Sequence, residues 1–410
     1  MSQRVCVVTA GHLSTCPRML KAADALAAAG YRVRVVSARY MDWATAADTE
    51  ARRTRKTDWE WTVVDYHRCS GRSTYLRSGL RFHAARMLAN GLGPGRCPLM
   101  VAARAYGRAH PELLRAALSR PADLFYGGTG AALAAVAFAA RRANVSYALD
   151  LEDFHSGEDR DDRLIERIER AILPGAAFLT AGSATIAWAY AEKYGLSPIP
   201  INNTFPLPTT PPALEPSPGE GLKLYWFSQT VGPGRGIEDA VEAMGLAGIP
   251  GELHCRGSAI PEYLEHLHRL AARSAPSLKL VHHEPAPPDS MVELCRGFDV
   301  GLAVEPGASV NNRLALSNKA FTYMLGGLAL VLTDTPGHGP LTSTVNEAAI
   351  VYTPGDTTTL AARLGRWARD KSRLARARSA AWQAACQRWH WEHPAERGAL
   401  LAAVSRALRH

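Results

Sequence analysis

The chain has 410 residues, of which 47% are hydrophobic and 21% charged, a balance typical of a soluble globular protein. Its length exceeds one ordinary hydrophobic core, so we expect two domains. No stretch offers eighteen uncharged apolar residues, and the N-terminus shows no signal-peptide pattern. These features exclude a membrane-spanning helix in the sequence and indicate a cytoplasmic protein. The seven scattered cysteines exclude a disulfide framework or a zinc site and indicate reduced thiols.

The excess positive charge lies in one segment. Residues 52–120 hold fourteen Lys and Arg against four Asp and Glu, which accounts for the whole net charge of +9. A basic surface attracts an anionic membrane face, a nucleic acid or a phosphorylated substrate, although a merely solvated face is the plain alternative. Interleaved aromatic residues and known nucleic-acid motifs are missing, so nucleic acid is disfavoured. Peripheral contact with the inner membrane face stays open.

The N-terminal half alternates strands with helices. Buried strands are predicted at residues 4–10 and 31–38, joined by a loop at 11–17 and a helix that Gly30 closes. The basic region follows, with a strand near 59–66 and helices from about 74 to 119. Strands return at 122–128 and 147–154, a further strand and helix follow within 175–195, and a last strand end lies at 199–205. Residues 72–91 fit an amphipathic helix with arginines on one side, which we interpret as an acceptor-side insertion rather than a membrane anchor.

The second half repeats this alternation after a linker. Residues 206–221 contain six prolines and no periodicity, so they form a linker with polyproline II character. Strands are predicted at 222–229, 251–257, 278–283, 298–305 and 328–332, and helices close the chain from about residue 359. Alternation of this kind predicts a parallel α/β sheet in each half. A cleft between two such domains is a natural ligand site.

Two segments of the second half suit an anion. Residues 232–236 form a glycine-rich loop that places Arg235 beside the first amides of a helix. Ser317 and Asn318 suit an N-cap, so Asn318 and Lys319 lie where backbone amides point outward. An ordinary capped core helix with a solvated lysine is the plain alternative for the second segment.

These motifs together resemble one enzyme family. A glycine loop with a basic residue, followed about eighty residues later by NKAFTYMLGGL (318–328), is similar to the retaining glycosyltransferases of the GT-B fold, family 4 or group 1. YALDLEDFHSGE (147–158) and RWHWEHPAER (388–397) extend the resemblance over most of the chain. It implies an N-terminal acceptor domain at 1–205 and a C-terminal donor domain at 222–387. It also implies two Rossmann-like domains facing across a cleft, with the last helix, about 388–410, returning to the first.

The resemblance also implies residue roles on the donor side. Arg235 matches the residue that grips the donor diphosphate, and Ser317, Asn318 and Lys319 match the segment lining the nucleotide and pyrophosphate site. The full set of donor-binding candidates is Gln229, Gly234, Arg235, Gly236, Ser317, Asn318, Lys319 and Thr322.

The chain departs from the family pattern at its acidic positions. The two glutamates of the family motif correspond to Leu314 and Thr322, and a second arginine of the glycine-loop region corresponds to Thr230. Glu305 lies upstream of the first motif position and is our candidate for a catalytic carboxylate in similar space.

On the acceptor side, polar residues follow the strand at 147–154. Glu152 falls where many relatives carry a cleft-facing histidine, and Asp153 follows it. Either carboxylate could accept the acceptor's proton or stabilise oxocarbenium character, so both are catalytic candidates; a loop capping the next helix is the plain alternative. The remaining acceptor-side candidates are Gly11, His12, Arg18 and His155. For His12 a structural role is as well supported as a functional one.

We expect neither a metal nor a cofactor, the donor being a nucleoside-diphosphate sugar. The D-x-D spacing at 159–161 opens an acidic helix, where first-turn aspartates need no metal to explain them. The predicted function is retaining, metal-independent transfer of a sugar to an unidentified acceptor: a glycan, a lipid-linked or acidic molecule, or a secondary metabolite. Two alternatives stay open, a nucleotide-sugar epimerase of the same fold and a non-catalytic sugar-nucleotide-binding partner subunit.

Overall fold

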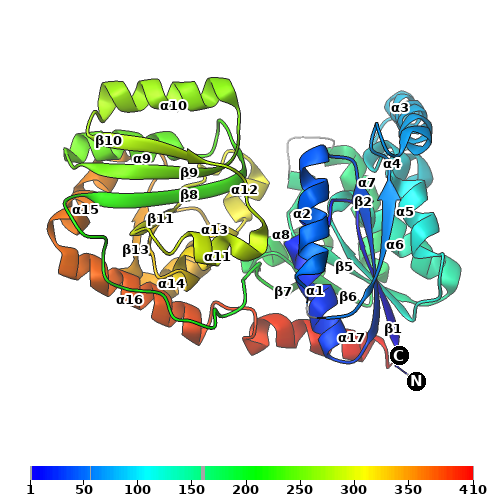
Figure 1. The fold of residues 1–410 in the computed structure, drawn as a ribbon. Coiled ribbons are helices and arrows are strands. Elements are labelled where there is room, and N and C mark those ends of the chain that lie inside the picture. The colour runs from blue at the N-terminus through cyan, green and yellow to red at the C-terminus, as the bar shows by residue number, and fades with distance from the viewer. Residues whose placement is uncertain (1, 56, 158–161, 410) are drawn as a thin grey trace. The chain divides into compact units, whose positions relative to one another are not determined.

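The computed structural model describes residues 2–55, 57–157 and 162–409, which form two compact α/β units (Figure 1). Unit 1 combines the chain up to Asn202 with Ser309–Asn311 and with the chain from Pro394 onward. Unit 2 combines Asn203–Ala308 with Asn312–His393. The first boundary falls close to the predicted end of the N-terminal domain at residue 205.

Unit 1 contains a seven-stranded parallel sheet with the strand order β3-β2-β1-β4-β5-β6-β7. Its strands are β1 (Arg4–Thr9), β2 (Arg32–Arg39), β3 (Glu60–Asp65), β4 (Leu124–Gly128), β5 (Ser146–Leu151), β6 (Phe178–Ala181) and β7 (Ile199–Pro200). Its α-helices are α1 (Pro17–Ala28), α2 (Asp42–Arg53), α3 (Arg72–Leu92), α4 (Leu99–Tyr106), α5 (His110–Ala117), α6 (Gly130–Ala143), α7 (Asp162–Ile172), α8 (Ala184–Tyr194) and α17 (Ala399–Ala407). Short 3-10 turns lie at His155–Gly157 and Leu173–Gly175, and a π-helical turn at Pro394–Gly398.

Unit 2 contains a six-stranded parallel sheet with the order β10-β9-β8-β11-β12-β13. Its strands are β8 (Leu222–Val231), β9 (Gly251–Ala259), β10 (Leu278–His283), β11 (Val300–Ala303), β12 (Ala329–Thr333) and β13 (Ala349–Tyr352). Its α-helices are α9 (Ile237–Ala247), α10 (Pro261–Ser274), α11 (Met291–Leu294), α13 (Asn318–Leu325), α14 (Gly339–Val345), α15 (Thr357–Arg369) and α16 (Lys371–Gln387). The short helix α12 (Val310–Leu314) begins in unit 1 and ends in unit 2. Two 3-10 turns lie at Pro288–Ser290 and Asn346–Ala348.

The strand order of unit 2 marks where a ligand is expected. From β8 the chain moves outward to β9 and β10 and then returns to β11 on the other side of β8. Ligands of open parallel sheets bind at the carboxyl ends of the strands where the order reverses in this way. The glycine loop follows β8 and Glu305 follows β11, so both segments lie at this point.

The core of unit 2 gives these segments a rigid base. Trp226 is fully buried in one apolar cluster of unit 2, and Tyr225, Phe321 and Tyr323 are fully buried in a second cluster, to which α13 contributes. Burial of each large apolar side chain stabilises the folded state by about 1.5–3 kcal/mol. The Tyr323 hydroxyl donates to the carbonyl of Leu302 at 3.1 Å, which ties α13 to β11.

The proline-rich segment is held on unit 2. Residues 206–221 contain neither helix nor strand. The buried guanidinium of Arg378 donates to the carbonyls of Ala213 at 2.9 Å and Glu215 at 2.7 Å, and pairs with Asp299 at 3.2 Å. These contacts explain why the second unit begins at Asn203, before the predicted linker.

The last helix belongs to unit 1, as the resemblance implied. The fully buried carboxylate of Glu396 accepts hydrogen bonds from the backbone N–H of Asn202 at 2.6 Å and from its side-chain amide at 2.8 Å. The Gln3 side chain donates to the carbonyl of Leu408 at 2.9 Å. Within the described residues, no helix combines the length and apolar character needed to cross a bilayer.

Candidate functional site

The glycine loop after β8 needs its glycines. Gly234 and Gly236 have φ angles of 75° and 76°, a backbone region that L side chains rarely adopt. A Cβ at position 236 would also overlap the carbonyl oxygen of Val304. Glycine at this position therefore lets the loop lie directly against the end of β11, next to Glu305.

Arg235 supplies the positive charge of this loop. Its side chain is partly buried, and the residues that the structure describes offer it no ion pair within 4 Å. The first turn of α9 carries Glu238 and Asp239, and Asp239 accepts bonds from the Tyr352 hydroxyl at 3.0 Å and the Gly355 N–H at 2.9 Å. Attraction for an anion here therefore comes from the guanidinium more than from the helix.

Glu305 and Lys319 form a buried ion pair at the start of α13. The Lys319 ammonium contacts Oε1 of Glu305, and the Ser317 hydroxyl donates to the same oxygen at 3.3 Å. The two charged side chains are only 10% and 13% exposed. Lys319 also lies 5.7 Å from the ring centroid of Trp226. Ser317 occupies the N-cap position, but its hydroxyl bonds Glu305 and not the helix backbone.

The second oxygen of Glu305 is buried without a hydrogen-bond partner among the described residues. Burial alone would raise the pKa of this carboxyl, but the adjacent Lys319 ammonium holds the pKa below its usual value. Glu305 is therefore a carboxylate at neutral pH. A buried acceptor without a partner is rare in folded proteins, and a ligand hydroxyl would satisfy it.

His338, which no sequence motif singled out, joins this cluster. The residue is 1% exposed, and its Nδ1 donates to the carbonyl of Thr333 at 2.9 Å. Its Nε2 is buried without a partner in the described part of the chain. Burial lowers the pKa of the imidazole, so the ring is neutral and Nε2 is an acceptor. Its place shortly after β12 was the available signal, because loops at strand ends carry ligand contacts.

The remaining donor candidates differ in their surroundings. Asn318 begins α13 and is partly exposed, and Gln229 is exposed on β8. Thr322 is fully buried, and its hydroxyl donates to the carbonyl of Asn318 at 3.4 Å. The structure thus gathers the glycine loop, Glu305, Ser317 and Lys319 at one edge of the sheet, whereas the Thr322 hydroxyl is directed into the helix.

In unit 1, the Arg18 side chain makes structural contacts. Its guanidinium forms a two-pronged ion pair with Asp150, at 2.7 Å from Nε and 2.5 Å from a terminal nitrogen. The other terminal nitrogen donates to the carbonyl of Ile201 at 2.5 Å. Burial would lower the pKa of this guanidinium, but Asp150 raises it overall. Arg18 joins α1 to β5 and to the residue that follows β7, and it has little surface left for an acceptor.

The His12 side chain also makes structural contacts. The ring is fully buried, and Nε2 accepts the backbone N–H groups of Tyr40 and Met41, both at 2.9 Å. Nδ1 must therefore carry the proton, which it donates to Asp48 at 2.7 Å. Gly11 lies beside it and accepts the Ala38 N–H at 3.0 Å. Both ring nitrogens of His12 are thus occupied by contacts within the protein.

The acidic loop after β5 keeps partly exposed groups. Glu152 follows the strand, is half-buried, and lies close enough to Arg18 to act on its pKa. Asp153 is also half-buried, and its carboxylate accepts the side-chain amide of Asn311 at 3.0 Å. The side-chain oxygen Oδ1 of Asn311 accepts the Phe154 N–H at 2.8 Å, so this residue fixes the loop. Its 158-residue separation from Asp153 hid the contact from the sequence.

His155 is the second buried histidine of interest. It is 4% exposed, and its Nε2 has no partner among the residues described. Its backbone N–H donates to the Tyr190 hydroxyl at 3.2 Å, and Tyr190 in turn donates to Glu169 at 2.6 Å. The Glu152–His155 loop therefore has a fixed backbone and presents several polar side chains.

Metal binding finds no support in the described side chains, which contain no group of three or more His, Cys, Asp or Glu able to hold an ion. The D-x-D segment at 159–161 lies outside the described residues. All seven cysteines are free thiols.

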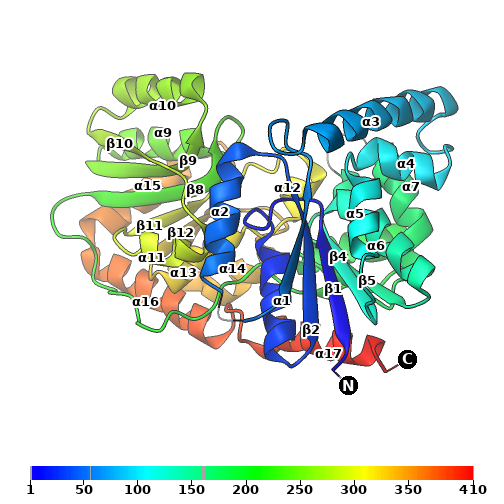
Figure 2. The same ribbon diagram turned by 45° about the vertical axis from the view of Figure 1, so that its right-hand side comes forward.

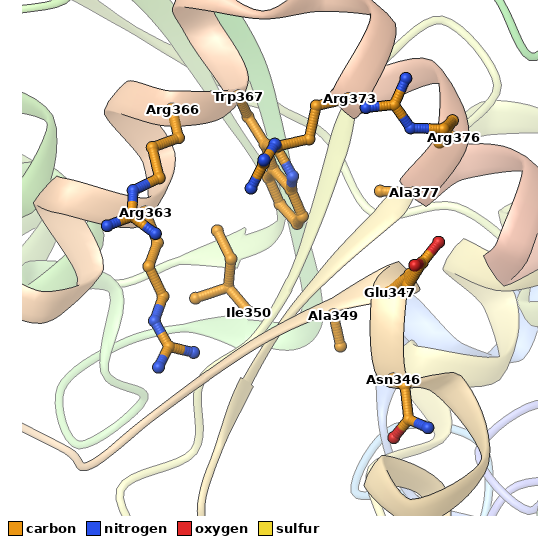
Figure 3. A pocket seen from close by; sticks show the side chains of 10 residues that line it. All are labelled: Asn346, Glu347, Ala349, Ile350, Arg363, Arg366, Trp367, Arg373, Arg376 and Ala377. Carbon is orange, nitrogen blue, oxygen red and sulfur yellow. The ribbon is translucent and has the colours of Figure 1, made fainter.

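A separate pocket of about 390 Å³ lies at the opposite end of the unit 2 sheet (Figure 3). Asn346, Glu347 and Ala349 at the amino end of β13 line it, together with four arginines of α15 and α16 around Trp367: Arg363, Arg366, Arg373 and Arg376. Ligands of parallel sheets bind at the carboxyl ends of the strands, so this basic pocket is not our candidate donor site.

No protein-family model matches the sequence, and a search of curated proteins finds no match. Solved structures, in contrast, match over nearly the whole chain. HepE of Anabaena, solved with UDP and glucose, has a TM-score of 0.65 at 16% identity, covering 99% of both chains. Sucrose-phosphate synthase of Thermosynechococcus elongatus has a TM-score of 0.65 at 14% identity, covering 99% and 98%. TarM of S. aureus has a TM-score of 0.66 at 8% identity, covering 100% and 99%.

These neighbours are glycosyltransferases of the GT-B class. The described residues form two parallel sheets with flanking helices, in agreement with that fold. The chain therefore has the GT-B fold, as the sequence motifs implied. At these identities the likeness shows the fold and leaves activity to be argued from the site.

Proposed function

We propose that this protein is a glycosyltransferase that moves a sugar from a nucleoside-diphosphate sugar to an acceptor, with retention at the anomeric carbon. The observation that carries this proposal is a set of charged side chains that follow the strands at the reversal point of the unit 2 sheet. These are Arg235, which has no ion pair among the described residues, and the buried pair of Lys319 and Glu305. The HepE and TarM structures include complexes with UDP, so a UDP-sugar is the first donor to test.

The two cations would hold the diphosphate. An ammonium has three donors, and Glu305 and its neighbourhood use only part of them, so Lys319 can bind a phosphate oxygen while Glu305 keeps it in place. Arg235 would add a planar pair of donors from the glycine loop. Negative charge develops on the leaving diphosphate, and fixed cations in a site of low water content stabilise it. We propose that these side chains make a divalent metal unnecessary.

The unpartnered acceptors would bind the sugar. Oε2 of Glu305 and Nε2 of His338 are both buried acceptor atoms near the same strand ends. Hydroxyl groups of the transferred sugar are donors that would satisfy them. A sugar lacking one of these hydroxyls would leave a buried acceptor unpaired, so the pair would also contribute to donor specificity.

Glu152 and Asp153 would serve the acceptor side of the reaction. Both are half-buried carboxylates at the carboxyl end of β5. Such a group can accept the proton of the attacking hydroxyl or stabilise positive charge on the sugar ring. Asn311 and the rigid loop around Tyr190 would keep Asp153 in position.

The test is donor turnover without an added acceptor, measured as release of nucleoside diphosphate. The donors are UDP-glucose, UDP-galactose and UDP-N-acetylglucosamine. Each assay is run with and without a chelator, which tests whether a divalent metal is needed. NMR recorded before mutarotation gives the anomer of the released sugar. An α-sugar from an α-linked donor supports retention, and a β-sugar rejects it. A changed configuration at C2 of the sugar would instead favour the epimerase. Tight UDP binding without release, in the presence of a broad acceptor extract, would favour the non-catalytic subunit.

A further inference from the structure

Helix α3 turns its large apolar side chains away from unit 1. Leu76, Leu80 and Met87 are 63%, 75% and 76% exposed. They are four and seven residues apart and therefore share one face of the helix. The face that packs inward carries Ser78, Ala85 and Ala89, which are buried. A helix on the surface of a soluble protein normally shows the reverse arrangement.

The position of α3 explains this pattern only in part. The helix packs on α4 and is the outermost helix on its side of unit 1 (Figure 2). Small inward residues allow close packing, but they do not require leucines outside. Leu88 and Leu92, near the end of the helix, lie outside this row and are also 50% and 48% exposed. A row of exposed apolar side chains marks a surface that contacts another apolar phase.

The charged residues nearest to the row in the sequence are all basic. Residues 66–111 include eight arginines and no aspartate or glutamate. Arg72 and Arg77 flank the apolar row along α3 and are exposed, and Arg96 is exposed in the loop that follows the helix. Arg81, in contrast, points inward and pairs with Glu112 at 2.6 Å. The exposed face therefore combines apolar side chains with positive charge, which complements an anionic lipid surface.

We propose that α3 lies in the headgroup layer of an anionic membrane. Leu76, Leu80 and Met87 enter the boundary of the acyl chains, and Arg72, Arg77 and Arg96 bind lipid phosphates. Because the helix lies in the plane of the interface, the contact is peripheral. The proposal does not depend on glycosyl transfer, since it concerns a surface outside the candidate donor site.

Flotation with lipid vesicles tests it. The full-length protein is mixed with vesicles of phosphatidylcholine alone or with 30% phosphatidylglycerol, on the order of the anionic content that a basic segment requires. We expect binding to the anionic vesicles only, weakening as salt is raised. Leu80→Gln with Met87→Gln should lower the partition coefficient at least tenfold. Arg72→Gln and Arg77→Gln should lower it about fivefold each.

Matched controls change similar residues elsewhere. Leu246→Gln removes a leucine of α9 that is 64% exposed, and Arg269→Gln removes an exposed arginine of α10. Both should bind vesicles like the wild type. Equal binding to neutral vesicles, or α3 variants that bind like these controls, would overturn the proposal. So would a dimer in sedimentation velocity that the Leu80→Gln, Met87→Gln variant dissociates, because the row would then pair two copies of the chain.

Discussion

Lys319 and Glu305 form a buried ion pair in which the lysine and Ser317 share one carboxylate oxygen while the other oxygen has no partner among the described residues. The pair lies at the carboxyl end of β11, against the glycine loop. One acidic and one basic group thus hold each other in place where the sheet reverses its strand order. This arrangement makes separate predictions for stability and for ligand binding.

Removing one partner of the pair should destabilise the protein strongly. Lys319→Met or Glu305→Gln leaves a buried group without its partner, which typically costs about 3–5 kcal/mol in the free energy of unfolding. The double variant should recover much of that loss, because neither charge then remains. Urea unfolding of all four proteins measures the coupling. Additive single effects would show that the two groups do not interact in solution.

Removing Arg235 should affect ligand binding and not stability, in contrast to removing Lys319 or Glu305. The structure gives its guanidinium no ion pair in the described chain, so Arg235→Ala should leave the free energy of unfolding nearly unchanged. The free energy with which this variant binds a nucleoside diphosphate should be weaker by about 1.5–3 kcal/mol, the range of a charged hydrogen bond.

A thermal-shift panel with UDP, GDP, ADP, CMP and dTDP measures this, since ligand at about 100 times its dissociation constant adds roughly 2.7 kcal/mol to native stability. The Arg366→Ala, Arg376→Ala variant is the control, because those arginines line the basic pocket at the other end of the sheet. Loss of the shift in this control instead of in Arg235→Ala would move the nucleotide to the basic pocket.

Acid should weaken unit 2 in two separate ranges. Burial lowers the pKa of His338 from its usual 6.5, so its stabilising effect is complete above pH 6.5 and is lost as the pH falls below that value. Lys319 lowers the pKa of Glu305 from 4.5, so that contribution is lost only below about pH 4.5. His338→Gln should flatten the stability profile below pH 6.5, and Glu305→Gln the profile below pH 4.5. Chemical denaturation from roughly pH 2 to pH 7 distinguishes the two, and identical profiles would contradict both assignments.

Local pattern was sufficient for most elements and for naming some of the donor candidates. Gly236 and Lys319 became candidates because a glycine loop and a helix start leave signatures within a few residues. Partners far apart in the chain leave none: Arg18 and Asp150 are 132 residues apart, and His12 and Asp48 are 36 apart. Without these partners, Arg18 and His12 resembled ligand contacts.

The direction of α3 also escaped prediction, for a different reason. Apolar residues at positions 76, 80 and 87 give the same periodicity whether the face is turned inward or outward. The inward surface depends on the small residues Ser78, Ala85 and Ala89 and on the space that α4 leaves. Only tertiary packing decides this, so a helical pattern cannot distinguish a core face from a membrane-facing one.

Arg18 should prove a structural residue. Its two-pronged pair with Asp150 is buried, so Arg18→Met should cost about 3–5 kcal/mol in the free energy of unfolding. Arg18→Lys cannot form both bonds and should recover only part of this. Arg4→Met, which breaks the exposed pair with Asp123, should change stability little. Full stability of Arg18→Met together with a raised KM for the acceptor would return Arg18 to the acceptor site.

Glu152 and Asp153 should separate binding from turnover. Both belong to unit 1, whereas the candidate donor residues belong to unit 2. Glu152→Gln and Asp153→Asn keep the shape of each side chain and remove its charge, so donor affinity should change less than twofold. Turnover should fall by about 10²–10⁴ for whichever carboxylate accepts the proton, the usual contribution of general base catalysis. The other variant should lose less.

Asn311→Ala should lower the rate through Asp153 alone, so its effect should disappear in an Asp153→Asn background. Unchanged turnover in both carboxylate variants would place the base elsewhere, with His155 the next group to test.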